Sequence, residues 1–267
     1  MRRTRSVILC VAVIIAAFFL IAVQQASADD LLFNRGLPTA NLNNAAGADR
    51  SNVAWADSES TSTPSEYWLP GDDFTLTSSA NVDDITVWIV GAGTTAPGFL
   101  PSGLSLFGGD AGGTISQIST TYTSAPVTYT DGTTYQSSSG NYWNLYQVNF
   151  AVNLSLSAGQ TYDFFVDQPY QCYSASCDTY VNAFLSASNA GLSGSTQEGA
   201  DGQFLWLDVN GATNTVETWN SDGAGWDKSS DANVQVYGSP VPEPASILLF
   251  GSGVLGLGIR LRRRFHI

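Results

Sequence analysis

The sequence predicts an all-β fold, an antiparallel β-sandwich of jelly-roll-like arrangement, flanked by two apolar ends. Around a dozen short runs alternate apolar and polar residues, as in 84–90, where Ile, Val and Ile share one face. Gly, Pro, Asn and Asp separate these runs, and almost nothing between them has the helical period. Many short strands with no helices between them favour two packed antiparallel sheets.

The expected strands follow one another along the chain between two ends of different composition. They are 73–77, 84–90, 103–107, 114–119, 127–130, 142–156, 161–166, 179–187, 203–209, 213–219 and 233–237. Asn210-Gly211 predicts a hairpin, because both residues accept positive φ, and Asp131-Gly132 predicts a second turn. We read 53–55 as a short early strand in a polar stretch, and 91–102 and 186–202 as surface loops.

The N-terminal end has the three parts of a secretory signal peptide. Arg2, Arg3 and Arg5 precede an apolar run over 6–23, and Ala-Ser-Ala closes it at 26–28. We therefore expect residues 1–28 to engage the export machinery and to be cut by signal peptidase before Asp29. The alternative is a membrane anchor that is retained, because the apolar run is long.

Residues 29–240 are then one extracytoplasmic domain of about 210 residues, enough to bury a substantial core. Between Asp29 and Pro242 three cations (Arg35, Arg50 and Lys228) face 22 acids, which gives a formal charge of −19. Such a surface repels phosphates, so we exclude nucleic acid as a partner.

Two cysteines remain in the exported part once the signal peptide is removed. Four residues separate Cys172 from Cys177, and in an exported domain we expect the two cysteines to form a local disulfide. A metal site is the alternative, but two thiolates need further ligands and the domain has no histidine.

The absence of histidine also limits the chemistry of the domain. His266 is the single histidine of the chain and lies in the C-terminal tail, which excludes Ser-His-Asp, Cys-His and histidine-ligated metal mechanisms in the domain. We assign no catalytic residue and no cofactor. A hydrolase of carbohydrates that uses paired carboxylates stays as the alternative enzyme class.

Calcium is the one ion that the acidic loops could hold. Asp222, Asp227 and Asp231 form a Gly-containing acidic stretch, and the pairs at 72–73 and 83–84 are further loop candidates. A solvated loop is the competing interpretation for each. In the stretch from Asp208, which resembles part of an EF-hand loop, the hairpin is the better interpretation.

Exposed aromatic rings could stack on sugar faces. We select Tyr142, Trp143, Trp219 and Trp226 as candidate glycan-stacking residues. Packing in the core is the competing interpretation for each ring.

The C-terminal end, 241–267, has three parts in strict order. Pro242-Glu243-Pro244 precedes an apolar run over 245–259, and a basic cluster over 260–264 follows. The prolines keep the linker extended, and the arginines place the C-terminus in the cytoplasm. This tail resembles the PEP-CTERM sorting signal of exported Gram-negative proteins. The segments 70–76 and 85–88 are distantly similar to β-sandwich modules that accompany such tails.

The resemblance implies processing by an exosortase near Pro242, Glu243 and Pro244, after a transient stay in the inner membrane. It also implies delivery to the cell surface or extracellular matrix, in association with exopolysaccharide. We therefore expect a non-catalytic surface or matrix protein that interacts with exopolysaccharide. The alternatives are the carbohydrate hydrolase and a structural layer stabilised by calcium.

Overall fold

The computed structural model describes residues 29–37, 53–55, 58–60, 66–93, 100, 102–118, 120–128, 135–136, 142–168, 171–172, 180–189, 197–210, 213–219 and 230–241. From Leu31 onward these residues belong to one unit of the chain. Their regular elements are all β-strands, and none of the described segments is a helix able to cross a membrane. The predicted signal peptide and the membrane helix of the tail lie outside the described residues.

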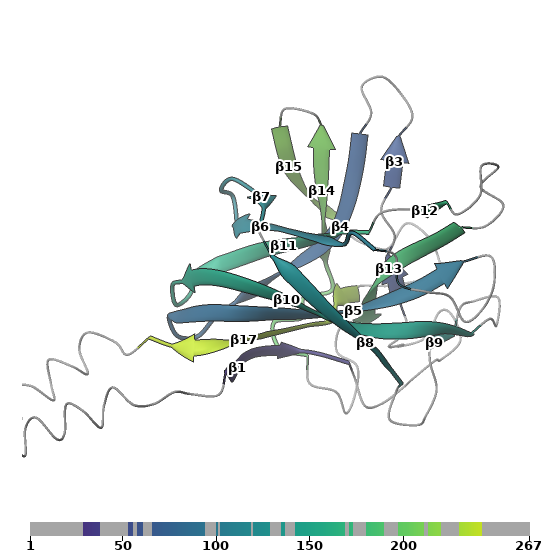
Figure 1. Ribbon diagram of the computed structural model, residues 1–267. Coiled ribbons are helices and arrows are strands. Elements are labelled where there is room, and N and C mark those ends of the chain that lie inside the picture. Colours follow the sequence, from purple (N-terminus) through teal and green to yellow (C-terminus); the bar gives the residue numbers. More distant parts are fainter. Residues whose placement is uncertain are drawn as a thin grey trace, which may run out of the picture. The chain divides into compact units, whose positions relative to one another are not determined.

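The larger sheet is antiparallel and has the central order β1-β17-β5-β10-β8 (Figure 1). These strands are β1 (Asp30–Arg35), β17 (Val234–Pro240), β5 (Ala80–Gly93), β10 (Tyr142–Leu156) and β8 (Thr121–Val127). Around β13 (Tyr180–Asn189), which also pairs with β5, lie β2 (Val53–Trp55), β12 (Gln171–Cys172) and β16 (Ser230–Ala232). The short β9 (Tyr135–Gln136) pairs with the start of β10.

The smaller sheet is also antiparallel, with the order β15-β14-β4-β11-β6-β7. Its strands are β15 (Thr213–Trp219), β14 (Phe204–Asn210), β4 (Glu66–Thr75), β11 (Thr161–Asp167), β6 (Ser105–Asp110) and β7 (Ser116–Gln117). An additional strand, β3 (Ser58–Ser60), pairs with β4.

The two sheets share one hydrophobic core. Ile85, Val87 and Ile89 of β5 enter it from the larger sheet, and Phe74 and Phe164 enter it from the smaller one. All five side chains are at most 1% exposed. The side chains that alternate with these in β5 point to the opposite face, as strand geometry requires, and there Trp88 and Val90 join a second cluster with Leu145. The all-β class and the two antiparallel sheets are therefore confirmed, while the jelly-roll arrangement stays a prediction.

Strong alternation located most of the strands. The expected strands at 142–156 and 213–219 have the observed bounds, and 53–55 is β2. The loop predicted over 91–102 begins later than expected, because β5 continues to Gly93. The loop predicted over 186–202 also begins later than expected, because β13 continues to Asn189. The end of β5 is extended because it pairs with β13, and the end of β13 is extended because Ser188 and Asn189 pair with β16.

The region of β8 is where the sequence prediction is wrong. A strand was expected at 127–130, but β8 occupies Thr121–Val127 and includes Pro126. Proline is tolerated there because β8 is an edge strand of its sheet. The expected turn at Asp131-Gly132 lies outside the described residues. However, β8 and β9 on either side of it both pair with β10.

The hairpin at Asn210-Gly211 is confirmed with a different register. β14 and β15 pair directly, and Asn210 lies opposite Thr213, so Gly211 and Ala212 are the two residues between them. Glycine first in a two-residue loop is itself a favoured hairpin sequence.

Gly238 marks an irregularity in β17. The register between β17 and β5 shifts between Tyr237 and Gly238. A Cβ atom at Gly238 would lie 2.1 Å from the Asn81 carbonyl oxygen, so the two backbones approach too closely for any larger residue.

Candidate functional site

The candidate glycan-stacking aromatics do not gather at one described place. Tyr142 and Trp143 open β10, and Trp143 is half-buried at the margin of the cluster formed by Trp88, Val90 and Leu145. Trp219 ends β15 in the other sheet, opposite Phe204. Trp226 lies outside the described residues. A common stacking platform formed by these four residues stays a prediction.

The acidic candidates for calcium occupy strands wherever the structure describes them. Asp72 and Asp73 lie in β4, Asp83 and Asp84 in β5, and Asp231 in β16, so the loop expected at these positions is wrong. Among the described residues, no group of three or more His, Cys, Asp or Glu side chains could hold a metal ion. Asp222 and Asp227 lie outside these residues, as does Cys177 of the expected disulfide, while Cys172 belongs to β12.

A densely connected polar group among the described residues surrounds Arg35. This side chain is 1% exposed, and its guanidinium lies between the carboxylates of Asp72 at 3.3 Å and Asp231 at 3.4 Å. It also donates to the carbonyl oxygens of Ala232 at 3.1 Å and Gly199 at 3.3 Å, and to that of Asp73. The Phe33 ring lies 5.5 Å from the guanidinium carbon.

Backbone amides donate further hydrogen bonds to the two carboxylates. Asp72 accepts from the amides of Ala232 at 2.6 Å and of Asp73 at 2.7 Å. Asp231 accepts from the amides of Asp201 at 2.9 Å and Gly202 at 3.0 Å. With its polar atoms paired inside the protein, this cluster joins β1, β4 and β16 and offers no open position to a ligand.

Burial dominates the electrostatics of the cluster. It raises the pKa of Asp231 to about 6, against the lowering effect of Arg35 and of two backbone amides. It raises the pKa of Asp72 well above its usual range for the same reason, and the charge of Asp231 adds to that rise. Sequence reasoning counted Arg35 among three cations but did not place it in the core. The signal available was its rarity in a domain of charge −19.

A carboxylate pair lies on the other face of β4. Asp73 and Asp163 are directly opposite each other on β4 and β11. Burial raises the pKa of Asp163 to about 6, and the charge of Asp73 adds to the shift. Directly opposed residues in antiparallel strands hold their Cβ atoms about 5 Å apart, so the two carboxyl groups are close neighbours, and glycosidases use such a carboxylate pair. Asp163 is only 3% exposed, however, so a sugar ring has little access to it.

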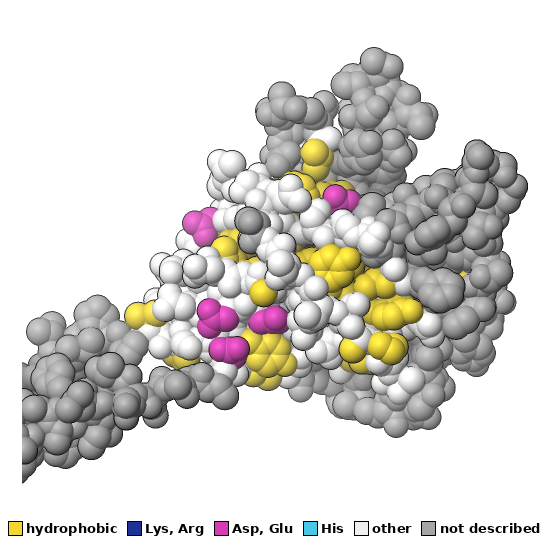
Figure 2. All heavy atoms as spheres, viewed as in Figure 1, with side chains coloured by type: hydrophobic (Ala, Val, Ile, Leu, Met, Phe, Trp, Pro, Cys, Tyr) yellow, Lys and Arg dark blue, Asp and Glu magenta, His cyan; other side chains and the backbone are white. Residues whose placement is uncertain are grey.

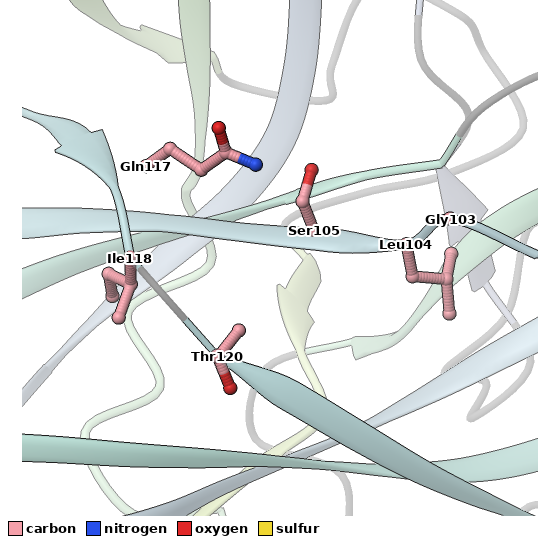
Figure 3. Close-up of a pocket in the computed structure, with 6 residues that line it drawn as sticks. All are labelled: Gly103, Leu104, Ser105, Gln117, Ile118 and Thr120. Atoms are coloured by element: carbon pink, nitrogen blue, oxygen red, sulfur yellow. The ribbon is translucent and has the colours of Figure 1, made fainter.

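A pocket of about 480 Å³ lies between the start of β6 and the segment that leads from β7 to β8 (Figure 3). Its lining consists of Gly103, Leu104, Ser105, Gln117, Ile118 and Thr120. Ser105 donates its hydroxyl to Asp167 at 3.1 Å, and Thr120 donates to the Ala151 carbonyl oxygen. These two hydroxyls are therefore engaged within the protein. Figure 3 shows that the lining side chains do not converge on one point.

The described surface is acidic or uncharged. Arg35 is the only Lys or Arg among the described residues, and it is buried. Figure 2 shows one face on which hydrophobic side chains lie among uncharged polar side chains and backbone, and acidic side chains gather over β5 and β17. No basic side chain is visible on the described part of that face. A ligand of this surface must be bound without a cation from these residues.

Comparison with known proteins identifies the tail. Residues 240–264 match the model of the PEP-CTERM protein-sorting motif, which includes Pro242, Glu243 and Pro244. Neither a curated protein nor a solved structure matches the chain. The motif implies export, a sorting signal that anchors the chain in a membrane, and an exosortase as the processing partner.

Proposed function

From the PEP-CTERM sorting motif, which makes the chain an exosortase substrate, we infer a non-catalytic protein of the cell surface or extracellular matrix. In this proposal a Gram-negative bacterium exports the chain and holds it transiently in the inner membrane. After processing, the β domain interacts with exopolysaccharide. The sorting motif is the single observation that carries the proposal.

The described domain supports a binding role over a catalytic one. Its densely connected polar group around Arg35 has its charges paired in the core. Its exterior offers amides, hydroxyls and carboxylates, which are groups that hydrogen-bond to sugar hydroxyls. The two antiparallel sheets suit this role, because they present broad faces.

A carbohydrate hydrolase is the second candidate, and the opposed pair Asp73 and Asp163 favours it. The raised pKa of Asp163, about 6, suits a general acid. In this alternative, a movement of the chain would have to expose Asp163 to substrate. A structural layer stabilised by calcium through Asp222 and Asp227 is a third hypothesis. A melting temperature that does not change when a chelator is added would contradict it.

One experiment separates binding from hydrolysis. The exported protein, recovered from bacteria that express the full chain, is incubated with a panel of bacterial polysaccharides. Retention of the protein and release of reducing ends are both measured. We expect retention without new reducing ends. Reducing ends that appear with the wild type and disappear in Asp163→Asn would establish the hydrolase instead.

A further inference from the structure

A row of uncharged polar side chains crosses the outer face of the larger sheet, the face away from the shared core. Gln235 of β17 lies opposite Thr86 of β5, Thr86 lies opposite Asn149 of β10, and Asn149 lies opposite Thr123 of β8. Asn34 of β1 extends the row, because it accepts a hydrogen bond from the Gln235 amide at 2.8 Å. We call these five residues the polar strip.

The polar strip spans five neighbouring strands. With strands about 4.8 Å apart, its length from β1 to β8 is about 19 Å. Thr86 forms the buried floor at 1% exposure, Asn34, Gln235 and Asn149 are partly exposed, and Thr123 is exposed. The strip is therefore a long, shallow surface and not a closed pocket.

Hydrogen bonds between its side chains hold the strip in order before any ligand arrives. The Gln147 amide donates to the Asn149 oxygen at 3.0 Å, and the Thr86 hydroxyl lies 3.2 Å from the same oxygen. At the other end the Tyr237 hydroxyl donates to the Gln235 oxygen at 2.9 Å. These contacts use the Asn149 oxygen and leave its NH₂ group, which has two donors, for a ligand. Side chains already ordered lose little entropy on binding.

We propose that the polar strip binds an uncharged polysaccharide chain that lies across the strands. Amides and hydroxyls can both donate to and accept from sugar hydroxyls, and the partly exposed Tyr237 ring lies beside the row. Asp84 flanks the strip on β5, next to Tyr237, and the domain as a whole has a formal charge of −19. An anionic polysaccharide would therefore be repelled. This inference rests on the proposed function and specifies its ligand class and surface.

Native gel electrophoresis tests the strip with defined probes. The protein recovered from cells expressing the full chain is run in gels that contain hydroxyethylcellulose or dextran, both uncharged, or alginate, which is anionic. We expect the wild type to be slowed by an uncharged polymer and not by alginate. The double variant Asn149→Ala/Gln235→Ala should bind roughly tenfold more weakly, since it loses two or more hydrogen-bonding groups.

A matched control removes the same residue types elsewhere. Asn153→Ala/Gln117→Ala changes an exposed amide on β10 beyond the strip and one that lines the pocket of Figure 3. It should bind like the wild type, and a loss of binding in this control would overturn the strip. Thr123→Glu places a charge at the exposed end of the strip. This variant should also weaken binding, and it tests the strip if the double variant does not fold.

The outcomes distinguish the two levels of the proposal. A wild type that no polymer slows would overturn both exopolysaccharide binding and the strip. If an uncharged polymer slowed the wild type and the double variant equally, the strip alone would be overturned. Retardation by alginate and by neither uncharged polymer would overturn the assigned ligand class.

Discussion

Arg35 is a cation whose position makes it part of the core. It connects the first strand of the domain with Asp72 of β4 and Asp231 of β16, which lie far away in sequence. Taking three charges out of water is expensive, and the attraction between them offsets that cost only while all partners are present. The cluster therefore contributes less to net stability than to fixing which strands meet.

Arg35→Met removes the cation and leaves two buried carboxylates without it. We expect the free energy of unfolding at pH 7 to fall by about 3–5 kcal/mol, because uncompensated buried charge is strongly destabilising. Urea unfolding followed by tryptophan fluorescence measures this. Asp83→Asn, a charge change at an exposed position of β5, serves as control. The triple variant Arg35→Met/Asp72→Asn/Asp231→Asn should recover part of the loss. A loss below about 1 kcal/mol in Arg35→Met would contradict the structural role.

The carboxyl groups also predict how stability depends on pH. Burial raises the pKa of Asp163 and of Asp231 to about 6, so the folded protein binds these protons more tightly than the unfolded chain does. The resulting stabilisation is complete below about pH 4, the ordinary pKa of aspartate, and is lost as the pH rises through about 6. We expect the melting temperature to fall by about 2–5 °C between pH 5 and pH 7.5. Asp163→Asn should reduce that difference, and a melting temperature that increased over this range would contradict the assignment.

At the scale of the elements, the sequence predicted strands well where alternation is long. The run at 146–156 alternates apolar and polar residues along its length, and the hairpin between β14 and β15 carries a strong turn signal. However, alternation predicts each strand separately and does not show where the strand lies in its sheet. It could not show that β8 tolerates Pro126, because that depends on β8 lying at an edge of the sheet.

The same limit applies to the candidate sites. Alternation in β10 places Gln147 and Asn149 on one face, but only the register with β5 and β17 aligns Asn149 with Gln235. Sequence reasoning looked for sugar contacts in aromatic rings, whereas the polar strip consists of amides and hydroxyls from five strands. Similarly, Asp72 and Asp231 appeared as solvated acids because no local pattern marks them as partners of Arg35.

For the whole molecule, the distribution of charge separates the domain from the ends of the chain. Seven of the ten Lys and Arg residues lie in residues 2–5 and 260–264, while residues 29–240 have a formal charge of −19. Basic residues beside an apolar segment favour the cytoplasmic side of a membrane. This pattern agrees with the sorting motif at 240–264, which implies export of the chain and a sorting signal that anchors it in a membrane.

Processing must therefore separate the domain from its tail before the protein can leave the membrane. Glu243 lies at the centre of the Pro-Glu-Pro tripeptide within the matched motif. We expect Glu243→Ala to keep most of the protein in the inner-membrane fraction, whereas Glu217→Ala, in the domain, is processed normally. Intact mass spectrometry of the wild type released by the producing bacterium should show a chain that lacks residues 260–264. A released protein that retains this basic cluster would show that the motif is not a cleavage signal here.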